Sequence, residues 1–388
     1  MNSHTFAHFD PARVPSPCFV VDAAAVEANL RLLREVQEAS GAKVLAALKA
    51  FAMAALGPLT ARHLSGTCAS GLHEARFGHE EVGGEVHVFA AAYGEAELRE
   101  ILAIADHVVF NSFEQWHRFR ELALEARARR PGLRFGLRIN PQHSEGTVPL
   151  YDPCAPGSRL GIPAGRFAGE SLEGISGLHF HTLCEQDFAP LDRTLAVVER
   201  DFGHLFDRLE WINFGGGHHI TRPGYDVDAL VARIRAFRAR HGLAVYLEPG
   251  EAVAIRTGVL VAEVLDVMDT DRPQAILDTS ATCHMPDTLE MPYRAEILGA
   301  GEAGERAHAY RLGGTTCLAG DVIGDYSFDA PLVVGQRLVF DDMAHYTMVK
   351  TTTFNGTPLP AIALWDSRSD TLEVLREFGY EAFRDRLG

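Results

Sequence analysis

The sequence predicts an α/β fold joined to an all-β one, namely an N-terminal (β/α)8 TIM-like barrel with a C-terminal β-domain. Strand-like and helical stretches alternate eight times over about 230 residues, which is the count and size of such a barrel. After Gly250, β-branched runs separated by Gly, Pro and Asp follow one another without helices between them. Reactive or polar residues end several of the first eight strands, where barrels of this kind carry their sites.

The barrel elements follow from the alternation of short apolar runs and amphipathic segments. Residues 18–21 form a short strand, and Asp22 is placed to cap a helix that ends at Ser40. Ser112 and Gln115 have the spacing of a capping box at the start of a later helix. A doubly wound sheet is the alternative, but its usual glycine fingerprint after the first strand is absent. The eight barrel strands are expected at 44–48, 66–69, 86–90, 107–110, 133–139, 177–181, 211–214 and 244–247.

The change of pattern near Gly250 predicts a boundary between two domains. We place the barrel at residues 22–257 and the β-domain at residues 258–388, with residues 1–21 adding a strand to the β-domain. A terminal helix is expected at residues 370–387. The strands of the β-domain are expected at 258–265, 275–278, 331–334 and 337–340.

Composition and charge narrow the classes of function. The net charge of −16 argues against a nucleic-acid surface and is compatible with a small cationic substrate. The six cysteines contain no C-x-x-C pair, which is typical of reduced thiols inside a cell. Because the sequence shows neither a signal-peptide pattern at its start nor an apolar run long enough for a bilayer, we expect a cytoplasmic protein without a membrane partner.

Lys49 follows the first barrel strand, directly after a run of small and apolar residues. A lysine at the end of a buried strand is unfavourable unless its charge is paired or its amine is modified. Removal of water makes an amine a better nucleophile towards carbonyl groups. The alternative is a lysine whose stem lies on apolar surface while its tip reaches water.

Three further strand ends carry groups that could bind a flat, charged molecule. His179 and His181 point to one face of their strand, so an imidazole could stack on a ring or serve as a hydrogen-bonded structural histidine. The glycines at 215–217 let backbone N–H groups face a phosphate, although a tight turn explains them as well. Glu248 could hold a ring-nitrogen proton, or it could pair with Arg138.

Together these groups predict a site for pyridoxal 5′-phosphate. A lysine binds the cofactor's aldehyde covalently, and an acidic partner keeps the ring nitrogen protonated so that the ring accepts electrons. A metal site is the rival interpretation, because 2-His-1-carboxylate sets exist among neighbouring residues. It leaves Lys49 and the glycines unexplained, so no metal is expected. The residues of that rival set are His179, His181, His218, His219 and Glu248.

Short motifs spread over nearly the whole chain allow a comparison with known families. They are Ala-Leu-Lys-Ala-Phe (47–51), Thr-Cys-Ala-Ser (67–70), His-Phe-His-Thr-Leu-Cys-Glu (179–185), Asn-Phe-Gly-Gly-Gly (213–217), Glu-Pro-Gly-Glu (248–251), Cys-His-Met-Pro-Asp (283–287), Gly-Thr-Thr-Cys-Leu-Ala-Gly-Asp (314–321), and Ala-His-Tyr-Thr (344–347) with Phe-Asn-Gly (354–356). Together they resemble the pyridoxal phosphate-dependent decarboxylases of alanine racemase-like fold, which include ornithine and diaminopimelate decarboxylases. Within that family the chain most resembles the carboxynorspermidine (carboxyspermidine) decarboxylases.

The resemblance implies a role for each matching residue. Lys49 would carry the cofactor, His181 would stack on its ring, and Glu248 would pair with the ring nitrogen. Members of the family are homodimers with two shared active sites, so Cys317 would cross the dimer interface and return a proton to the substrate carbon. The phosphate would be held by Gly216, Gly217 and Tyr346.

The chain departs from the ornithine-type pattern at three matching positions, one of which is near Cys184, where that pattern has a serine after the strand of the stacking histidine. Where that pattern has an arginine that reaches the phosphate, this chain has Glu251, and Leu318 stands where it has an acid. A carboxylate gained here suits a cationic substrate tail and argues against diaminopimelate, whose distal carboxylate requires a basic residue. These changes agree with the carboxynorspermidine branch.

We therefore expect decarboxylation of carboxynorspermidine or carboxyspermidine to norspermidine or spermidine, a step of polyamine biosynthesis. Two alternatives remain, another decarboxylase of the same fold (diaminopimelate or ornithine type) and a pyridoxal phosphate carrier without turnover. The acids expected to bind the amines of this polyamine-like substrate are Glu251, Asp287 and Asp321, with Glu290 as a further candidate.

Overall fold

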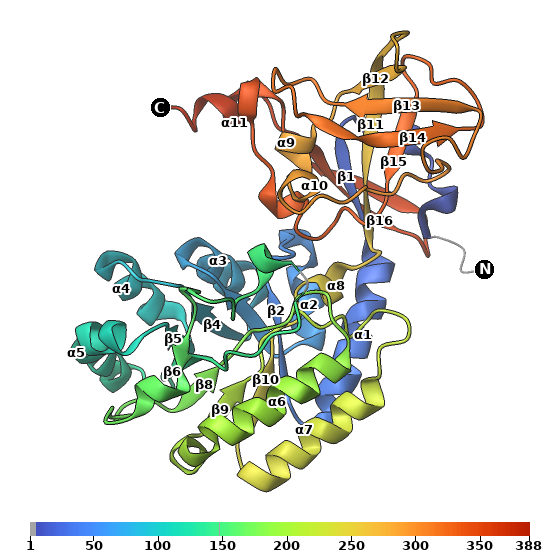
Figure 1. Ribbon diagram of the computed structural model, residues 1–388. Coiled ribbons are helices and arrows are strands. Elements are labelled where there is room, and N and C mark those ends of the chain that lie inside the picture. The colour runs from blue at the N-terminus through green and yellow to red at the C-terminus, as the bar shows by residue number, and fades with distance from the viewer. Residues whose placement is uncertain (1–4, 147) are drawn as a thin grey trace. The chain divides into compact units, whose positions relative to one another are not determined.

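The structure is a computed structural model that describes residues 5–146 and 148–388. The chain divides into two compact units (Figure 1). One unit is Glu27–Val253. The other joins Ala254–Gly388 to the described residues up to Val26. Each unit has its own sheet.

The first unit is a closed barrel of eight parallel strands, as the sequence predicts. Each strand pairs with its neighbours, and the pairings of β5 with β6 and of β10 with β2 close the ring. The strands are β2 (Lys43–Ala47), β3 (Gly66–Ala69), β4 (Glu85–Phe89), β5 (His107–Phe110), β6 (Arg134–Asn140), β8 (Gly177–His179), β9 (Trp211–Asn213) and β10 (Ala244–Leu247). Their apolar side chains are almost entirely buried, which is expected for a parallel sheet covered on its outer face.

Helices of the connections cover the outside of the barrel (Figure 1). Asp22 accepts a hydrogen bond from the Ala24 N–H at 3.0 Å, which satisfies a free donor at the start of the first helix. Within the described residues, no helix combines the length and the apolar character needed to cross a membrane. The helices are α1 (Ala23–Ser40), α2 (Gly57–His63), α3 (Leu72–Phe77), α4 (Glu95–Ile104), α5 (Phe113–Arg129), α6 (Phe188–Phe202), α7 (Val227–His241) and α8 (Glu251–Ala254).

Two local predictions for the barrel need correction. Ser112 caps α5 by accepting from the Gln115 N–H at 3.1 Å, but the Gln115 side chain donates to the Ala91 carbonyl instead of returning to Ser112. Only half of the capping box therefore forms. The connection from β6 to β8 has no α-helix in its described residues, and holds short 3-10 turns and the two-residue strand β7 (Ile162–Pro163).

Aromatic side chains fill the barrel near the N-terminal ends of its strands. The rings of His107 and Trp211 lie 4.7 Å apart, and those of His87 and Tyr246 also lie 4.7 Å apart. The Trp211 indole needs the space above Gly177, where a Cβ would be 2.0 Å from the indole Cε2. This packing leaves the C-terminal ends of the strands as the place for a ligand.

The second unit is an all-β domain, as predicted. The sheet order is β14-β13-β12-β11-β1-β16-β17, and β15 pairs with β11. The strands are β1 (Cys18–Asp22), β11 (Gly258–Met268), β12 (Gln274–Leu277), β13 (His308–Gly313), β14 (Val322–Phe328), β15 (Arg337–Phe340), β16 (Ala361–Asp366) and β17 (Thr371–Arg376). The short helices α9 (Ala281–His284), α10 (Asp287–Glu290) and α11 (Tyr380–Arg384) complete the unit. Strand β1 lies between β11 and β16, and its inward side chains pack with Phe6, Phe9 and Trp365.

Two element predictions fail in this unit. Residues 331–334 form no strand, and the side chains of Val333 and Val334 are 60% and 64% exposed. The expected terminal helix at 370–387 is mostly wrong, because residues 371–376 pair antiparallel with β16 and only Tyr380–Arg384 is helical. The pairing with β16 lets Leu372 pack against the core. A local sequence pattern does not predict this contact.

Candidate active site

Lys49 lies in the turn that follows β2 at the C-terminal end of the barrel. The Leu48 N–H donates to the Cys68 carbonyl at 3.1 Å, which continues the β2–β3 pairing up to the turn. The Lys49 Nζ lies 3.4 Å from Nε2 of His181. The first and sixth barrel strands thus bring their two reactive groups together.

His181 is held as a neutral imidazole by its surroundings. The Gly216 N–H donates to its Nδ1 at 3.0 Å, which leaves the ring proton on Nε2. Burial, reinforced by the nearby Lys49 and Arg138 charges, lowers the pKa of His181 well below its ordinary value. Arg138 also donates to the His181 carbonyl at 3.1 Å, so both the ring and the backbone of this residue are fixed.

Glu248 follows β10, and both of its carboxylate oxygens are anchored. Oε2 lies 3.0 Å from Nε2 of His179, and Oε1 accepts from the Asn213 side-chain amide at 2.8 Å. Burial raises the pKa of Glu248, but the contact with His179 outweighs it, so the pKa falls to about 2. The structure describes no ion pair between Arg138 and Glu248, and the Arg138 guanidinium lies 4.5 Å from the centre of the Phe89 ring.

The glycines at 215–217 form a turn that no larger residue fits. A Cβ on Gly216 would lie 2.0 Å from the Glu248 carbonyl oxygen, and one on Gly217 would lie 1.9 Å from that of Leu183. Gly217 also has φ +83°, a left-handed conformation that favours glycine. Within the described residues the Gly217 N–H has no acceptor, as expected for a turn that offers N–H groups to an anion.

Glu251 opens α8 and is paired with a histidine from the segment after the glycine turn. Its Oε2 lies 2.8 Å from Nε2 of His219. The His219 N–H donates to the Gln186 carbonyl at 3.0 Å, which ties this segment to the one that follows His181. The Glu251 carboxylate therefore contacts the segment that directly follows the glycine turn.

The β-unit contributes Cys317 on an exposed loop. The Cys317 N–H donates to the Asn355 side chain at 2.9 Å. Asp321 closes the same loop, because its carboxylate accepts from the Thr316 hydroxyl at 2.7 Å and from the Ser280 hydroxyl at 3.0 Å. Asp321 is thus buried in a hydrogen-bond network that shapes the loop of Cys317.

The remaining predicted residues of the β-unit have partners of their own. Asp287 and Glu290 both form ion pairs with Lys350, and the Glu290 contact measures 2.5 Å. Tyr346 has φ +50°, and its ring meets the His345 ring edge-on. These residues lie in the other unit from Lys49.

The C-terminal end of the barrel, or barrel rim, contains four residues whose roles the sequence did not predict. His179 and Asn213 hold the Glu248 carboxylate, and Asn213 also accepts from the Gly215 N–H at 2.8 Å. The Cys68 thiol lies close enough to Glu248 and Lys49 for both charges to affect it, although burial is the main cause of its raised pKa. Phe89 contacts both Arg138 and His179. Asn213 gives a local signal for its role, since it stands just before the glycines.

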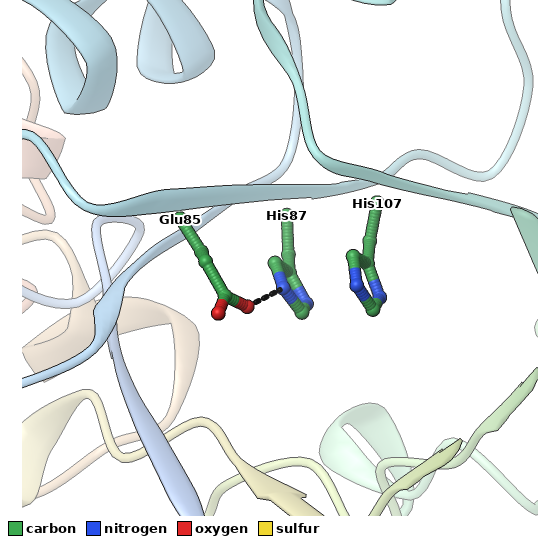
Figure 2. A group of neighbouring side chains, drawn as sticks. All are labelled: Glu85, His87 and His107. Carbon is green, nitrogen blue, oxygen red and sulfur yellow. Dashed lines mark hydrogen bonds and ion pairs between the residues drawn. The ribbon is translucent and has the colours of Figure 1, made fainter. Parts of the chain in front are cut away.

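A separate group of possible metal ligands lies near the N-terminal ends of the strands. Figure 2 shows Glu85, His87 and His107 side by side, with donor atoms within 4.8 Å of one another. The two imidazoles are stacked with centres 3.9 Å apart and planes 11° apart, so their nitrogen lone pairs run parallel instead of converging. The Lys43 ammonium also pairs with Glu85. This geometry favours a hydrogen-bonded group inside the barrel over a metal centre.

Three histidines of the rival metal set bind groups outside that set. His218 bonds to the Tyr225 hydroxyl at 2.9 Å, and burial lowers its pKa to about 4. His219 contacts Glu251, and His181 accepts from Gly216. The barrel rim therefore combines an amine, a neutral imidazole, an anionic carboxylate and a glycine turn, a set suited to a phosphorylated aromatic aldehyde rather than to a metal.

Comparison with known proteins identifies the class. A family model described as "Pyridoxal-dependent decarboxylase, C-terminal sheet domain" matches residues 18–344. A carboxyaminopropylagmatine decarboxylase of Synechocystis is 47% identical over 97% of this chain and 96% of that protein. A carboxynorspermidine/carboxyspermidine decarboxylase of Campylobacter jejuni is 43% identical over 96% of this chain and 98% of that protein.

A solved structure agrees with these relatives. The carboxynorspermidine decarboxylase of Campylobacter jejuni complexed with norspermidine superposes with a TM-score of 0.88 at 42% identity, over 96% of this chain and all of that one. The chain belongs to the pyridoxal-dependent decarboxylases. The family membership and the fold that the sequence motifs predicted are both confirmed.

The Glu248 carboxylate should make stability depend on pH in a specific way. A depressed pKa contributes stability that is fully present above the ordinary value of 4.5 and is lost as the pH falls through about 2. The difference in unfolding free energy between the wild type and Glu248→Gln should therefore be constant above the ordinary pKa of 4.5. It should shrink as the pH falls from there towards about 2. Urea unfolding of the cofactor-free protein between about pH 3 and about pH 7 measures this difference.

Glu121 provides the matched control, because it is an exposed glutamate of α5. Glu121→Gln should leave the unfolding free energy within about 0.5 kcal/mol at every pH, as is usual for a surface change. A Glu248→Gln difference that stays constant down to the lowest pH would show that the buried carboxylate is not ionised in the native state.

Proposed function

We propose that this protein decarboxylates carboxynorspermidine or carboxyspermidine, using pyridoxal 5′-phosphate, to yield norspermidine or spermidine. The observation that supports it most is the connected group at the barrel rim, in which Lys49 meets His181, His181 meets Gly216, and the turn at Gly215 meets Glu248. The chain's similarity to carboxynorspermidine decarboxylases over nearly its whole length supports the substrate.

The residues at the rim fit this cofactor. The Lys49 amine would bind its aldehyde, and the His181 imidazole, fixed by the Gly216 N–H, would stack on its ring. In the described residues the Gly217 N–H has no acceptor, and the glycine turn has no side chains, so both features suit a phosphate group. The family resemblance suggests Tyr346 as a further phosphate ligand. The ionised Glu248 is ready to accept a ring N–H. When bound, pyridoxal phosphate accepts the electron pair released with carbon dioxide.

Residues of this chain would handle the amine and proton steps. The substrate's α-amine would displace Lys49, whose amine is then released beside His181. The bond between the α-carbon and the carboxylate breaks, carbon dioxide leaves, and one proton is added to the same carbon. We assign that proton to the Cys317 thiol, which is exposed on a loop fixed by Asp321 and Asn355.

We propose that Cys317 acts in the active site of a partner subunit in a homodimer. Its neighbours Leu318 and Phe354 are 45% and 43% exposed, and such apolar side chains are commonly covered at an interface. A site shared between subunits would bring this loop to the barrel residues of a second copy of the chain.

Acidic residues would bind the amines of the substrate. We propose Glu251, Asp287 and Asp321, with Glu290 as a further candidate. The ion pairs that Asp287 and Glu290 form with Lys350 support an affinity of this acid pair for an alkyl ammonium. Asp321 would share its carboxylate between a substrate amine and the hydroxyls of the Cys317 loop.

A second candidate substrate is carboxyaminopropylagmatine. The 47% identical relative is named for it, and its distal end is a guanidinium instead of an amine. The reacting carbon is the same in both substrates, so the rim residues would serve either. Recognition of the distal cation by the acids would then decide between them.

We also propose a cytoplasmic location and no nucleic-acid partner. All six cysteines are free, in line with a reducing compartment. The net charge of −16 supports a cationic small-molecule substrate and disfavours a phosphate backbone as a ligand.

The decisive experiment supplies purified protein with pyridoxal phosphate and a panel of substrates. Carbon dioxide release is expected with carboxynorspermidine or carboxyspermidine, and Lys49→Ala should lower the rate by on the order of a thousandfold because the cofactor loses its covalent attachment. Borohydride reduction followed by mass spectrometry should find the cofactor on Lys49. Lys43→Ala, at the other end of the same strand, is the matched control and should retain both cofactor and activity.

Other outcomes separate the alternatives. Faster turnover of carboxyaminopropylagmatine would favour the second candidate substrate. Turnover of ornithine or diaminopimelate instead would contradict both candidate substrates. Bound cofactor without carbon dioxide release from any substrate would indicate a carrier. Failure to bind pyridoxal phosphate at all would contradict the proposed function.

The glycine turn gives a test of cofactor binding. Gly217→Ala combines a left-handed φ with a Cβ only 1.9 Å from the Leu183 carbonyl oxygen, so the turn must move. We expect the Kd for pyridoxal phosphate to rise at least about tenfold, through loss of backbone contacts to the phosphate. Gly224→Ala is the control, since Gly224 has a similar φ of +89° but open space around it. Equal Kd values for the two variants would remove Gly217 from the phosphate site.

Shared active sites can be tested by mixing two inactive chains. Lys49→Ala and Cys317→Ala variants, co-expressed with different tags, should form hybrid dimers in which one of the two sites is complete. With random pairing, about a quarter of the wild-type activity should return. If each site used residues of a single subunit, the mixture would be no more active than the separate variants.

A further inference from the structure

His179 is a buried histidine at the end of β8, and it contacts Glu248 directly. Its side chain is 2% exposed, and its Nε2 lies 3.0 Å from Oε2 of Glu248. The Phe89 ring stacks against the imidazole, with centres 5.5 Å apart and planes 26° apart. One edge of the imidazole is therefore aimed at the carboxylate while its face is held by an aromatic ring.

The chemistry of this contact fixes the tautomer of His179. An ionised carboxylate only accepts hydrogen bonds, so Nε2 must carry the proton that it donates to Glu248. Burial lowers the pKa of His179 despite the neighbouring Glu248 charge, and the Arg138 charge acts in the same direction. In the described residues its Nδ1 is buried without a partner, consistent with an unprotonated nitrogen.

We infer that His179 is a positioning residue: its Nε2–H holds one oxygen of Glu248 so that the carboxylate keeps a fixed direction and a free lone pair for the ring nitrogen of pyridoxal phosphate. This inference rests on the proposed function. His179 itself is one hydrogen bond removed from the cofactor, whereas His181 is the residue beside Lys49.

Asn213 anchors the other oxygen, so the carboxylate has two neutral donors. Each oxygen retains a second lone pair that can accept the ring N–H. Asn213 also accepts from the Gly215 N–H, which ties the direction of the carboxylate to the glycine turn. The group that would meet the ring nitrogen and the turn that would meet the phosphate are therefore held by one side chain.

Neutral donors have an advantage over a cation at this position. A guanidinium paired with Glu248 would compete for the charge that stabilises a protonated ring nitrogen. Arg138 is instead turned towards the Phe89 ring and the His181 carbonyl. The titratable groups around Glu248 are His179, His87, Cys68 and Arg138, and only Arg138 carries a permanent charge.

The test compares two cofactors in three forms of the full-length protein. His179→Leu removes the donor at similar volume, and His179→Gln keeps an N–H near the position of Nε2. Pyridoxal phosphate and its 1-deaza analogue, which has a carbon in place of the ring nitrogen, are titrated into each cofactor-free protein. We expect His179→Leu to raise the Kd of pyridoxal phosphate about tenfold and that of the analogue less than about twofold.

Kinetics with the natural cofactor give a second readout. His179→Leu should lower kcat at least about tenfold with KM nearly unchanged, because the polyamine end of the substrate does not contact Glu248. His179→Gln should recover most of the lost rate. His63→Leu is the control for loss of a buried histidine outside the site, and it should change neither Kd nor kcat.

The outcomes distinguish this inference from the proposed function. An equal loss of affinity for both cofactors would reduce His179 to a structural residue, and unchanged values would remove it from the site. If His179→Leu does not fold, His179→Asn replaces it, because its shorter amide cannot reach Glu248. Should the wild type bind neither cofactor, the proposed function fails, and the role of His179 fails with it.

Discussion

Asn213 makes two hydrogen bonds on which the barrel rim depends. Its amide group donates to Glu248, and its oxygen accepts from Gly215. The strand register makes this possible, because His179 of β8 pairs directly with Asn213 of β9, and Asn213 pairs with Tyr246 two residues before Glu248. A shift of one residue in either pairing would turn these side chains to the other face of the sheet. The chemistry of the rim is therefore fixed by backbone pairing.

The glycine turn shows how closely the rim is packed. At Gly216 and Gly217 the missing Cβ atoms allow two neighbouring backbone segments to approach, the one at Glu248 and the one at Leu183. The same approach lets the Gly216 N–H reach the imidazole of His181. Three strand ends are thereby joined through main-chain contacts, so their side chains hold their directions before any ligand arrives.

Local patterns explain which parts of the structure the sequence could predict. The alternation of strands and helices was enough to place Lys49, His181, the glycine turn and Glu248 at one end of a barrel. The partners of these residues were not predictable, since the contact between His179 and Glu248 joins strands far apart in the chain. The same limit explains the terminal segment, where pairing with β16 overrides a helical pattern in residues 371–376. Contacts such as that of Glu251 with His219 belong to this non-local class as well.

The central place of β1 in the second sheet has a consequence for how the chain is made. Cys18–Asp22 is synthesised before the barrel strands, but its parallel neighbour β16, Ala361–Asp366, is synthesised after them. The barrel residues are complete on the ribosome while β1 still lacks both of its neighbours. The apolar strand β1 therefore stays unpaired, accessible to chaperones and to wrong pairings, until β11 and β16 have been synthesised. Loss of β16 would leave that strand with an open edge.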